Sequence, residues 1–146
     1  GVITVVGGKL TTYRRMAEDA VDTAVRLREL PARACWTARL PLVGAPGHRD
    51  SRPTPEGAVA SSLLARHGGA AREVLAAGEE LLGAGYGAPV AEGIDVTRAE
   101  IVYALTHEGA LDPEDVLHRR TRIGLVPADA DRARPTVEEI AAKARV

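Results

Sequence analysis

The sequence predicts a mainly α protein: a small, bundle-like helical domain preceded by one strand and a strand-to-helix turn. Three observations support this prediction. Apolar residues recur at spacings of three and four along several segments. Thr or Asp stands where these segments begin, and Gly or Pro where they end. Only the β-branched run Val2–Val6 has the composition of a strand.

The turn after this strand is the most distinctive short feature of the sequence. Gly7 and Gly8 follow the strand, Lys9 adds a positive charge, and Thr11 or Thr12 can cap the helix that begins there. Glycines allow the backbone to approach a ligand closely, and the free N–H groups of a first helical turn attract anions. The corner could therefore hold an anionic group. The alternative is a tight turn with a solvated lysine, because the patterns GxxxxGK[ST] and GxGxxG are absent.

A long amphipathic helix is predicted over Thr12–Leu30, with Pro31 ending it. Residues 31–53 contain four prolines and two glycines in no regular pattern, which indicates an irregular linker. Five more helices are expected, at about 54–67, 70–82, 98–109, 112–122 and from 136 to the end. Thr97 and Asp112 are the predicted caps of the third and fourth of these.

Composition narrows the classes of function. A chain of 146 residues is long enough for one domain with a core. The net charge of −1 gives no electrostatic basis for binding nucleic acid. The single Cys35 excludes an internal disulfide and favours a reducing, cytoplasmic compartment. A strand with no partner elsewhere in the sequence indicates that Val2–Val6 belongs to a sheet of a longer protein.

Candidate chemical groups are few, and each has a structural alternative. His107-Glu108 is not a zinc motif, because Leu111 stands where HExxH needs a second histidine. The other histidines lack the spacing of metal ligands, so no metal site is expected. The cluster Arg119, Arg120 and Arg122 could grip a phosphate, or could join its helix to carboxylates of a neighbouring helix or domain, which is favoured. No pair of nucleophile and base is evident, so no catalytic residue is assigned.

Two stretches resemble a known family. GGKLTTYRRMAEDAVD at 7–22 and RAEIVYALTHEGALDPEDVLHRRTRIGL at 98–125 are similar to the C-terminal region of FAD-dependent, respiratory glycerol-3-phosphate dehydrogenases, in the same order and at a similar separation. With the helical stretch between them, the resemblance covers nearly the whole chain.

The resemblance implies a flavoenzyme that oxidises sn-glycerol 3-phosphate to dihydroxyacetone phosphate and passes electrons from FAD to a quinone. It implies that Gly7, Gly8, Lys9, Leu10 and Thr11 form a loop against the flavin, with Lys9 also near the substrate. Residues 1–30 would then be the last strand, loop and helix of the FAD-binding domain, 31–53 a linker and 54–146 the C-terminal helical domain. The remainder of the enzyme is the expected partner, in the cytoplasm or peripherally at the cytoplasmic face of the membrane, and a homo-oligomer is left open.

The family's other functional residues lie upstream of this chain, so the chain alone is expected to be inactive, to retain no FAD and to have a structural role. An alternative hypothesis is an autonomous helical module for interaction or assembly. A third is a phosphate or nucleotide binder that uses the Gly7–Lys9 corner by itself, without the walls of a pocket.

Overall fold

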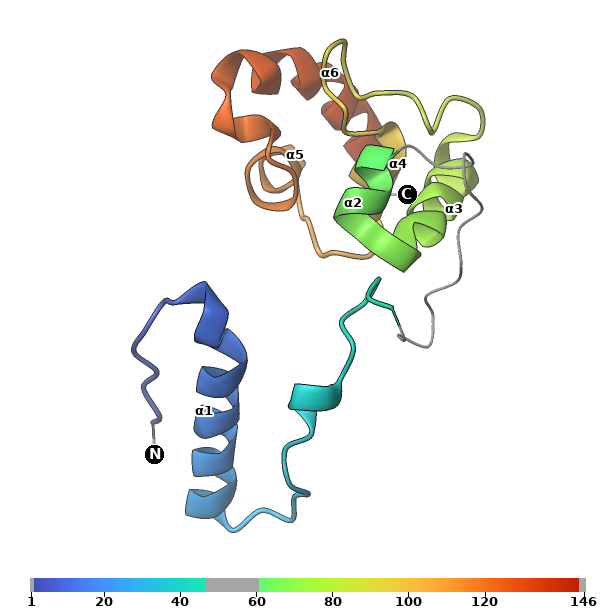
Figure 1. Cartoon of the computed structure of the whole chain (residues 1–146). Coiled ribbons are helices and arrows are strands. Elements are labelled where there is room, and N and C mark those ends of the chain that lie inside the picture. Colours follow the sequence, from blue (N-terminus) through green and yellow to red (C-terminus); the bar gives the residue numbers. More distant parts are fainter. Residues whose placement is uncertain (1, 47–60, 145–146) are drawn as a thin grey trace. The chain divides into compact units, whose positions relative to one another are not determined.

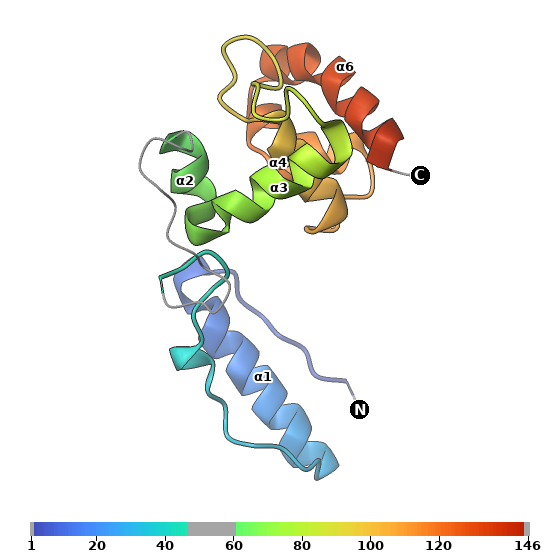
Figure 2. The same cartoon turned by 90° about the vertical axis from the view of Figure 1, so that its right-hand side faces the viewer.

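The computed structural model describes residues 2–46 and 61–144. Figures 1 and 2 show its elements from two directions. The chain divides into two compact units, Gly1–Pro41 (unit 1) and Leu42–Val146 (unit 2), and the division falls inside the segment 31–53. Each unit is described by itself. The described part of the chain is mainly helical, which confirms the predicted fold class.

Unit 1 is built around one long helix, α1 (Tyr13–Arg28). A short 3₁₀ turn, η1 (Leu10–Thr12), leads into it, and a second one, η2 (Thr37–Arg39), lies in the extended chain that follows. The helix ends in a left-handed residue, Glu29, with φ of 49°. The N–H of Leu30 donates to the carbonyl of Val25 at 3.0 Å, as in a Schellman motif. The predicted long helix is confirmed, and it ends two residues before the expected Leu30.

The predicted strand over Val2–Val6 is not formed in this structure. Residues 2–9 have no regular secondary structure and are drawn as an extended chain alongside α1 in both views (Figures 1 and 2). The β-branched composition produces the extended backbone, but a strand also requires a neighbouring strand to bond with. The described residues hold a single isolated β-bridge, between Pro89 and Thr97 in unit 2.

None of the described residues of unit 1 is buried. The apolar stripe of α1 includes Val21 and Leu27, and the Leu27 side chain is 67% exposed.

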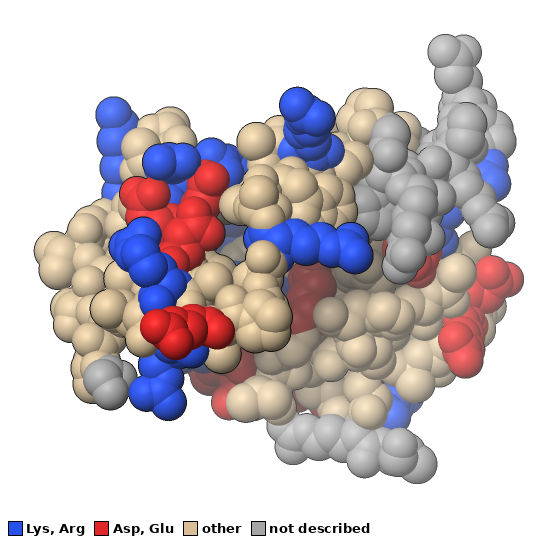
Figure 3. Space-filling model, turned by 90° about the horizontal axis from the view of Figure 1, so that it is seen from below, with Lys and Arg blue, Asp and Glu red and all other residues tan. Residues whose placement is uncertain are grey.

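On the face drawn in Figure 3, basic and acidic side chains lie next to one another between broad areas that carry neither charge. Ion pairs of α1 follow the same intermixed pattern, with Arg14 and Arg15 both within 3.1 Å of Glu18.

Unit 2 holds the remaining helices of the described chain. In order they are α2 (Ser61–His67), η3 (Gly68–Ala70), α3 (Ala71–Leu82), α4 (Arg98–Thr106), α5 (Pro113–Asp115), the π-helix η4 (Val116–Arg120), η5 (Ile123–Leu125) and α6 (Pro127–Ala144). The α4 helix is central, since α3 and α6 both pack against it.

The core of unit 2 collects the apolar faces of these helices. Ile101 and Val102 of α4, Leu117 of η4 and Ile140 of α6 are almost completely buried in its main cluster. A second, smaller cluster joins α2 to α3 and α4 through Leu63, Ala71, Val74 and Ala99. The close packing of α3 on α4 depends on Gly78, where a Cβ would lie 2.5 Å from the Cβ of Ala99.

The glycine-rich loop between α3 and α4 is part of this core, because Val90, Ile94 and Val96 on it are buried. Two of its carbonyls also accept hydrogen bonds from the backbone N–H groups of the first turn of α4. The N–H of Arg98 donates to the Ala88 carbonyl at 2.9 Å, and the N–H of Ala99 donates to the Tyr86 carbonyl at 2.9 Å. The loop thus removes unpaired donors from a buried helix end.

Several predicted boundaries need correction. The helix expected at 70–82 is confirmed as α3, whereas the one at 98–109 ends earlier, at Thr106. The helix expected at 112–122 is only briefly α-helical and then continues as the π-helix Val116–Arg120. For the helix expected at 54–67, residues 54–60 lie outside the described residues.

The last helix starts at Pro127, nine residues before the predicted start at Thr136. The predicted start at Thr136 follows directly on Pro135, and a proline inside a helix removes one backbone hydrogen bond. The turns before Pro135 nevertheless bury Ala130 and Ala133, and Ala133 belongs to the main core cluster. Tertiary burial therefore outweighs the local cost of Pro135, while Pro127 occupies a first-turn position that suits proline.

Candidate functional site

The glycine-lysine corner of unit 1 is formed by residues 7–12. Gly7 has φ of 147°, and a Cβ there would lie 2.6 Å from the Cε of Met16. A Cβ on Gly8 would meet no atom within 4 Å. Contacts within the chain therefore account for the glycine at position 7 but not for the one at position 8.

Lys9 precedes η1 with an extended backbone, and Leu10 and Thr11 form the first turn. Leu10 is 81% exposed. Among the described residues, no carbonyl accepts from the N–H groups of Leu10 and Thr11, and no carboxylate forms an ion pair with Lys9. The corner thus presents unpaired donors and one free positive charge.

The predicted side-chain cap of α1 is wrong. Thr12 is the N-cap residue, but its side chain accepts no hydrogen bond from the helix. Its hydroxyl instead donates to the Lys9 carbonyl at 3.0 Å and lies 3.6 Å from the Met16 sulfur. Because the hydroxyl faces backwards, the first-turn N–H groups stay without a side-chain partner.

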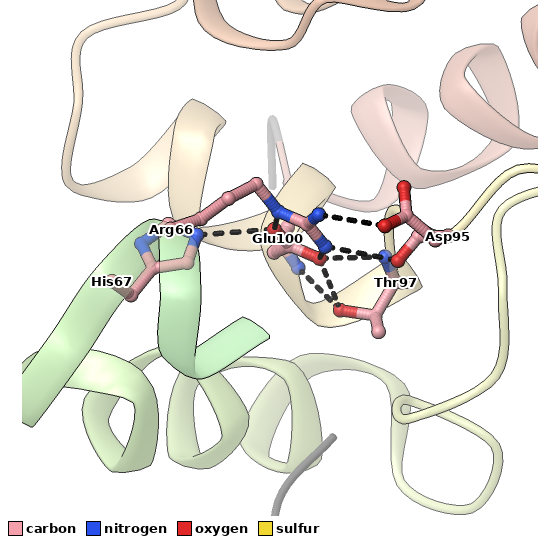
Figure 4. Close-up of polar contacts among 5 residues, drawn as sticks. All are labelled: Arg66, His67, Asp95, Thr97 and Glu100. Carbon is pink, nitrogen blue, oxygen red and sulfur yellow. Dashed lines mark hydrogen bonds and ion pairs between the residues drawn. The ribbon is translucent and has the colours of Figure 1, made fainter. Parts of the chain in front are cut away.

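A second polar cluster lies in unit 2 around Glu100, at the start of α4 (Figure 4). The Glu100 side chain is only 5% exposed. Arg66 donates from Nε to Glu100 Oε1 at 2.6 Å and from Nη2 to Oε2 at 3.1 Å. His67 Nε2 lies 3.1 Å from Oε1, so two residues of α2 supply three nitrogens to this one carboxylate.

The same carboxylate closes the start of its own helix. The Thr97 N–H donates to Glu100 Oε2 at 2.7 Å, and the Glu100 N–H donates to the Thr97 hydroxyl at 3.4 Å. This is a capping box, and it confirms Thr97 as the predicted cap. Arg66 also bonds Asp95, through its carboxylate at 3.1 Å and its carbonyl at 2.9 Å.

These contacts set the charge state of Glu100. Burial raises the pKa of the carboxyl, but hydrogen bonds from His67, Arg66 and Thr97 outweigh it and lower the pKa to about 2. Glu100 is therefore ionised at neutral pH, with both oxygens already bonded. Such a carboxylate is a poor proton acceptor, and its role is to join α2 to α4.

Sequence reasoning missed this cluster, although one signal was present. Thr97 and Glu100 have the spacing of a capping box, whereas the prediction used Thr97 alone. Arg66 is 34 positions away in the sequence and has no local signal that connects it to Glu100.

The predicted structural role of His107 agrees with its surroundings. Its ring stacks on Tyr103 with centroids 4.6 Å apart and planes at 9°. The Thr106 hydroxyl lies 2.7 Å from His107 Nδ1 and donates to the Val102 carbonyl. Among the described residues, no group of three His, Cys, Asp or Glu side chains could hold a metal ion.

The three arginines predicted as a cluster separate into two environments. Arg119 forms an ion pair with Asp115 one turn earlier. Arg120 and Arg122 instead line a cavity of about 650 Å³ within unit 2, whose other walls include Arg66, Glu100 and Glu108. Asp112 accepts from the Asp115 N–H at 2.8 Å, so it is the predicted cap of this segment.

Fold and polar cluster together define a small α-helical domain whose buried charges hold helices together. The chain belongs to the family described as the C-terminal domain of alpha-glycerophosphate oxidase, whose sequence model matches residues 35–145. This match confirms the resemblance noted from the sequence. In the described part of the chain, no helix combines the length and hydropathy required to cross a bilayer.

The chain is also similar to individual curated proteins. Glycerol-3-phosphate dehydrogenase 1 of Mycobacterium tuberculosis is 52% identical over 139 residues, which are 95% of this chain and 26% of that protein. The mitochondrial glycerol-3-phosphate dehydrogenase of Arabidopsis thaliana is 34% identical over 97% of this chain and 26% of its own length. The chain thus spans about a quarter of these relatives. No solved structure matches it.

Proposed function

We propose that this chain is the C-terminal quarter of a FAD-dependent enzyme that oxidises sn-glycerol 3-phosphate to dihydroxyacetone phosphate and passes the electrons to a quinone. One structural observation carries the proposal: the described residues of unit 1 bury none of their side chains, although α1 has an amphipathic sequence. Such a segment needs an apolar surface from another part of the protein. The names and lengths of the relatives support the same interpretation.

In this proposal, residues 1–30 complete the FAD-binding domain, 31–53 form the linker and 54–146 form the helical C-terminal domain. The family model begins at residue 35, which supports assigning the preceding helix to a different domain. Residues 2–6 would pair with a sheet upstream, and the apolar stripe of α1 would pack on that domain. The main core cluster of unit 2 consists of residues of unit 2, which supports the interpretation that residues 54–146 pack as a separate domain.

Gly7, Gly8, Lys9, Leu10 and Thr11 are the proposed contacts with the flavin, and their geometry fits such a ligand. Gly8 leaves open space where a Cβ would stand, and the N–H groups of Leu10 and Thr11 lack acceptors in the described chain. When bound, FAD supplies the group that accepts the hydride. The unpaired N–H donors would stabilise negative charge on the reduced ring. Lys9 would add a charge beside the phosphate of the substrate.

The proposed location is the cytoplasm, with the enzyme attached peripherally at the cytoplasmic face of the membrane. The second candidate function, an autonomous helical module for assembly, draws on the self-contained core of unit 2. It leaves the exposed stripe of α1 without a role, which is why the flavoenzyme is preferred.

The test is a titration of FAD into this chain and into the longer enzyme that carries it, followed by flavin absorbance and fluorescence. We expect only the longer enzyme to hold flavin and to reduce a dye with glycerol 3-phosphate. Lys9→Ala in that enzyme should reduce dye turnover about tenfold or more, since one preorganised charge contributes on this scale.

Lys143→Ala is the matched control, because Lys143 is a surface lysine of unit 2 whose ion pair within the described residues is with Glu139. Equal loss in both variants would contradict a special role for Lys9. Flavin retention by the 146-residue chain alone would show that the corner is a self-sufficient site and that the proposed division of labour is wrong.

A further inference from the structure

Two arginines in the wall of the unit 2 cavity, Arg120 and Arg122, form no ion pair with the described residues. Several other charged residues of the cavity wall have partners within the chain. Arg66 is bonded to Glu100, and Asp129 is bonded to Arg132 at 2.7 Å. Asp95, which also lines the cavity, shares Arg66 with Glu100, so these groups leave no unpaired positive charge in the wall.

Arg120 and Arg122 differ from most arginines of the unit. Neither forms an ion pair with any carboxylate of the described residues, although both line the cavity. Arg72 also lacks an ion pair there, but it is not part of the cavity wall. Among the described residues of the wall, Glu108 forms no ion pair, and Asp95 shares Arg66 with Glu100, so Arg120 and Arg122 are the guanidinium groups left without a carboxylate partner.

The backbone that carries these arginines is held firmly. Thr121, between them, donates from its hydroxyl to the Val116 carbonyl at 2.8 Å. Ile123 is buried, and Gly124 lies so close to His118 that a Cβ would be 2.2 Å from its Nδ1. A fixed backbone lowers the conformational entropy that the arginines lose when they bind a partner.

Apolar side chains follow directly on the same segment. Leu125 is 78% exposed and Val126 is 49% exposed, although both stand between the core residues of η5 and α6. Arginines beside exposed apolar side chains are the composition of a protein interface. The rest of the enzyme is favoured over a membrane surface as the occupant, because the relatives are about four times as long as this chain.

We propose that Arg120, Arg122, Leu125 and Val126 form a docking surface, and that its occupant is a carboxylate-bearing, partly apolar surface of the remaining three quarters of the same enzyme. The inference rests on the proposed function, since relatives are about four times as long as this chain. Planar guanidinium groups bind carboxylates through two parallel hydrogen bonds, which fixes orientation as well as attraction. The surface would hold the helical domain on the catalytic body.

The test compares backbone hydrogen exchange at residues 120–126 in the longer enzyme and in the 146-residue chain. We expect exchange there to be about tenfold slower in the longer enzyme. Arg120→Gln combined with Arg122→Gln should abolish most of this difference, while Arg119→Gln should not, because Arg119 already pairs with Asp115.

Equal exchange in both proteins, or an effect of Arg119→Gln as large as that of the double variant, would overturn the proposal. Protection of the short chain by a second copy, or by vesicles containing an anionic lipid, without protection in the longer enzyme would also overturn it. Flavin content and dye turnover of the longer enzyme are measured in the same samples. If flavin is retained without protection at 120–126, the docking surface is wrong and the proposed function stands; if flavin and turnover are absent, the proposed function itself fails.

Discussion

Units 1 and 2 are both helical, yet their helices are stabilised differently. The α1 helix of unit 1 has sixteen residues and buries none of them, whereas the nine-residue α4 of unit 2 buries five. An isolated helix of this length is marginal in water, so most helical stability comes from packing of an apolar face. The comparison shows that apolar periodicity predicts a helix, but does not predict which surface packs against the apolar face of that helix. Five predictions test it, beginning with the largest expected effect and ending with the smallest.

Truncating a large apolar side chain should destabilise unit 2 far more than unit 1. Ile140 is completely buried in unit 2, and Ile140→Ala is expected to lower the free energy of unfolding by roughly 4 kcal/mol, because it leaves a cavity. Leu27→Ala in unit 1 should cost less than about 0.5 kcal/mol in the 146-residue chain. Urea unfolding followed by circular dichroism measures both.

The Leu27 variant also distinguishes the two candidate functions. If α1 packs on an upstream domain, Leu27→Ala should destabilise the longer enzyme by about 2 kcal/mol or more. A cost as small there as in the short chain would mean that the stripe stays exposed.

Breaking the ion-pair cluster should have the next largest effect. Glu100→Ala leaves His67 without its partner and Arg66 with Asp95 alone. A loss of about 2–3 kcal/mol is expected, because Glu100 is buried whereas Arg66 is partly exposed. Glu139→Ala is the control, because it removes an exposed carboxylate with ion pairs to Lys143 and Arg98. It should cost less than about 1 kcal/mol.

The same cluster predicts a dependence on pH. The pKa of Glu100 is lowered from 4.5 to about 2, so its stabilising contribution is present above about pH 4.5 and is lost as the pH falls through 2. The difference in unfolding free energy between the wild-type chain and Glu100→Ala should therefore shrink steadily between pH 5 and pH 2.5. A constant difference over this range would contradict the lowered pKa.

The smallest expected effect is a gain in unit 1. Glu29 has a left-handed backbone that favours glycine, so Glu29→Gly should raise the stability of the end of α1 by about 0.5–1 kcal/mol. Hydrogen exchange of the last turn of α1 measures this change. Glu108→Gly is a matched comparison at a residue without positive φ, and no gain is expected there.

Local signals were enough for much of the fold. The caps Thr97 and Asp112 were predicted because each satisfies N–H groups three residues along the chain. The long helix of unit 1 followed from its apolar period and the proline after it. The corner residues Gly7 to Thr11 were located as a turn, but their proposed contact with FAD comes from a resemblance and stays a prediction.

Where tertiary contacts compete with local preference, the sequence was misleading. The last helix was predicted to start at Thr136, but it starts at Pro127, and the added turns bury Ala130 and Ala133. The side chain of Thr12 turned towards the Lys9 carbonyl instead of capping α1. The ion pair of Glu100 with Arg66 could not be predicted, because the two residues meet only in the folded chain.

The sequence by itself determined the helical class, most helix positions and the family, because spacing, caps and motifs act over a few residues. Only the tertiary structure decided which stripes are covered, where α6 begins and which charges are paired. The physical reason is that burial and ion pairing join residues far apart in the chain, as Arg66 and Glu100 are. Their free energy depends on solvent exclusion, which no local pattern encodes.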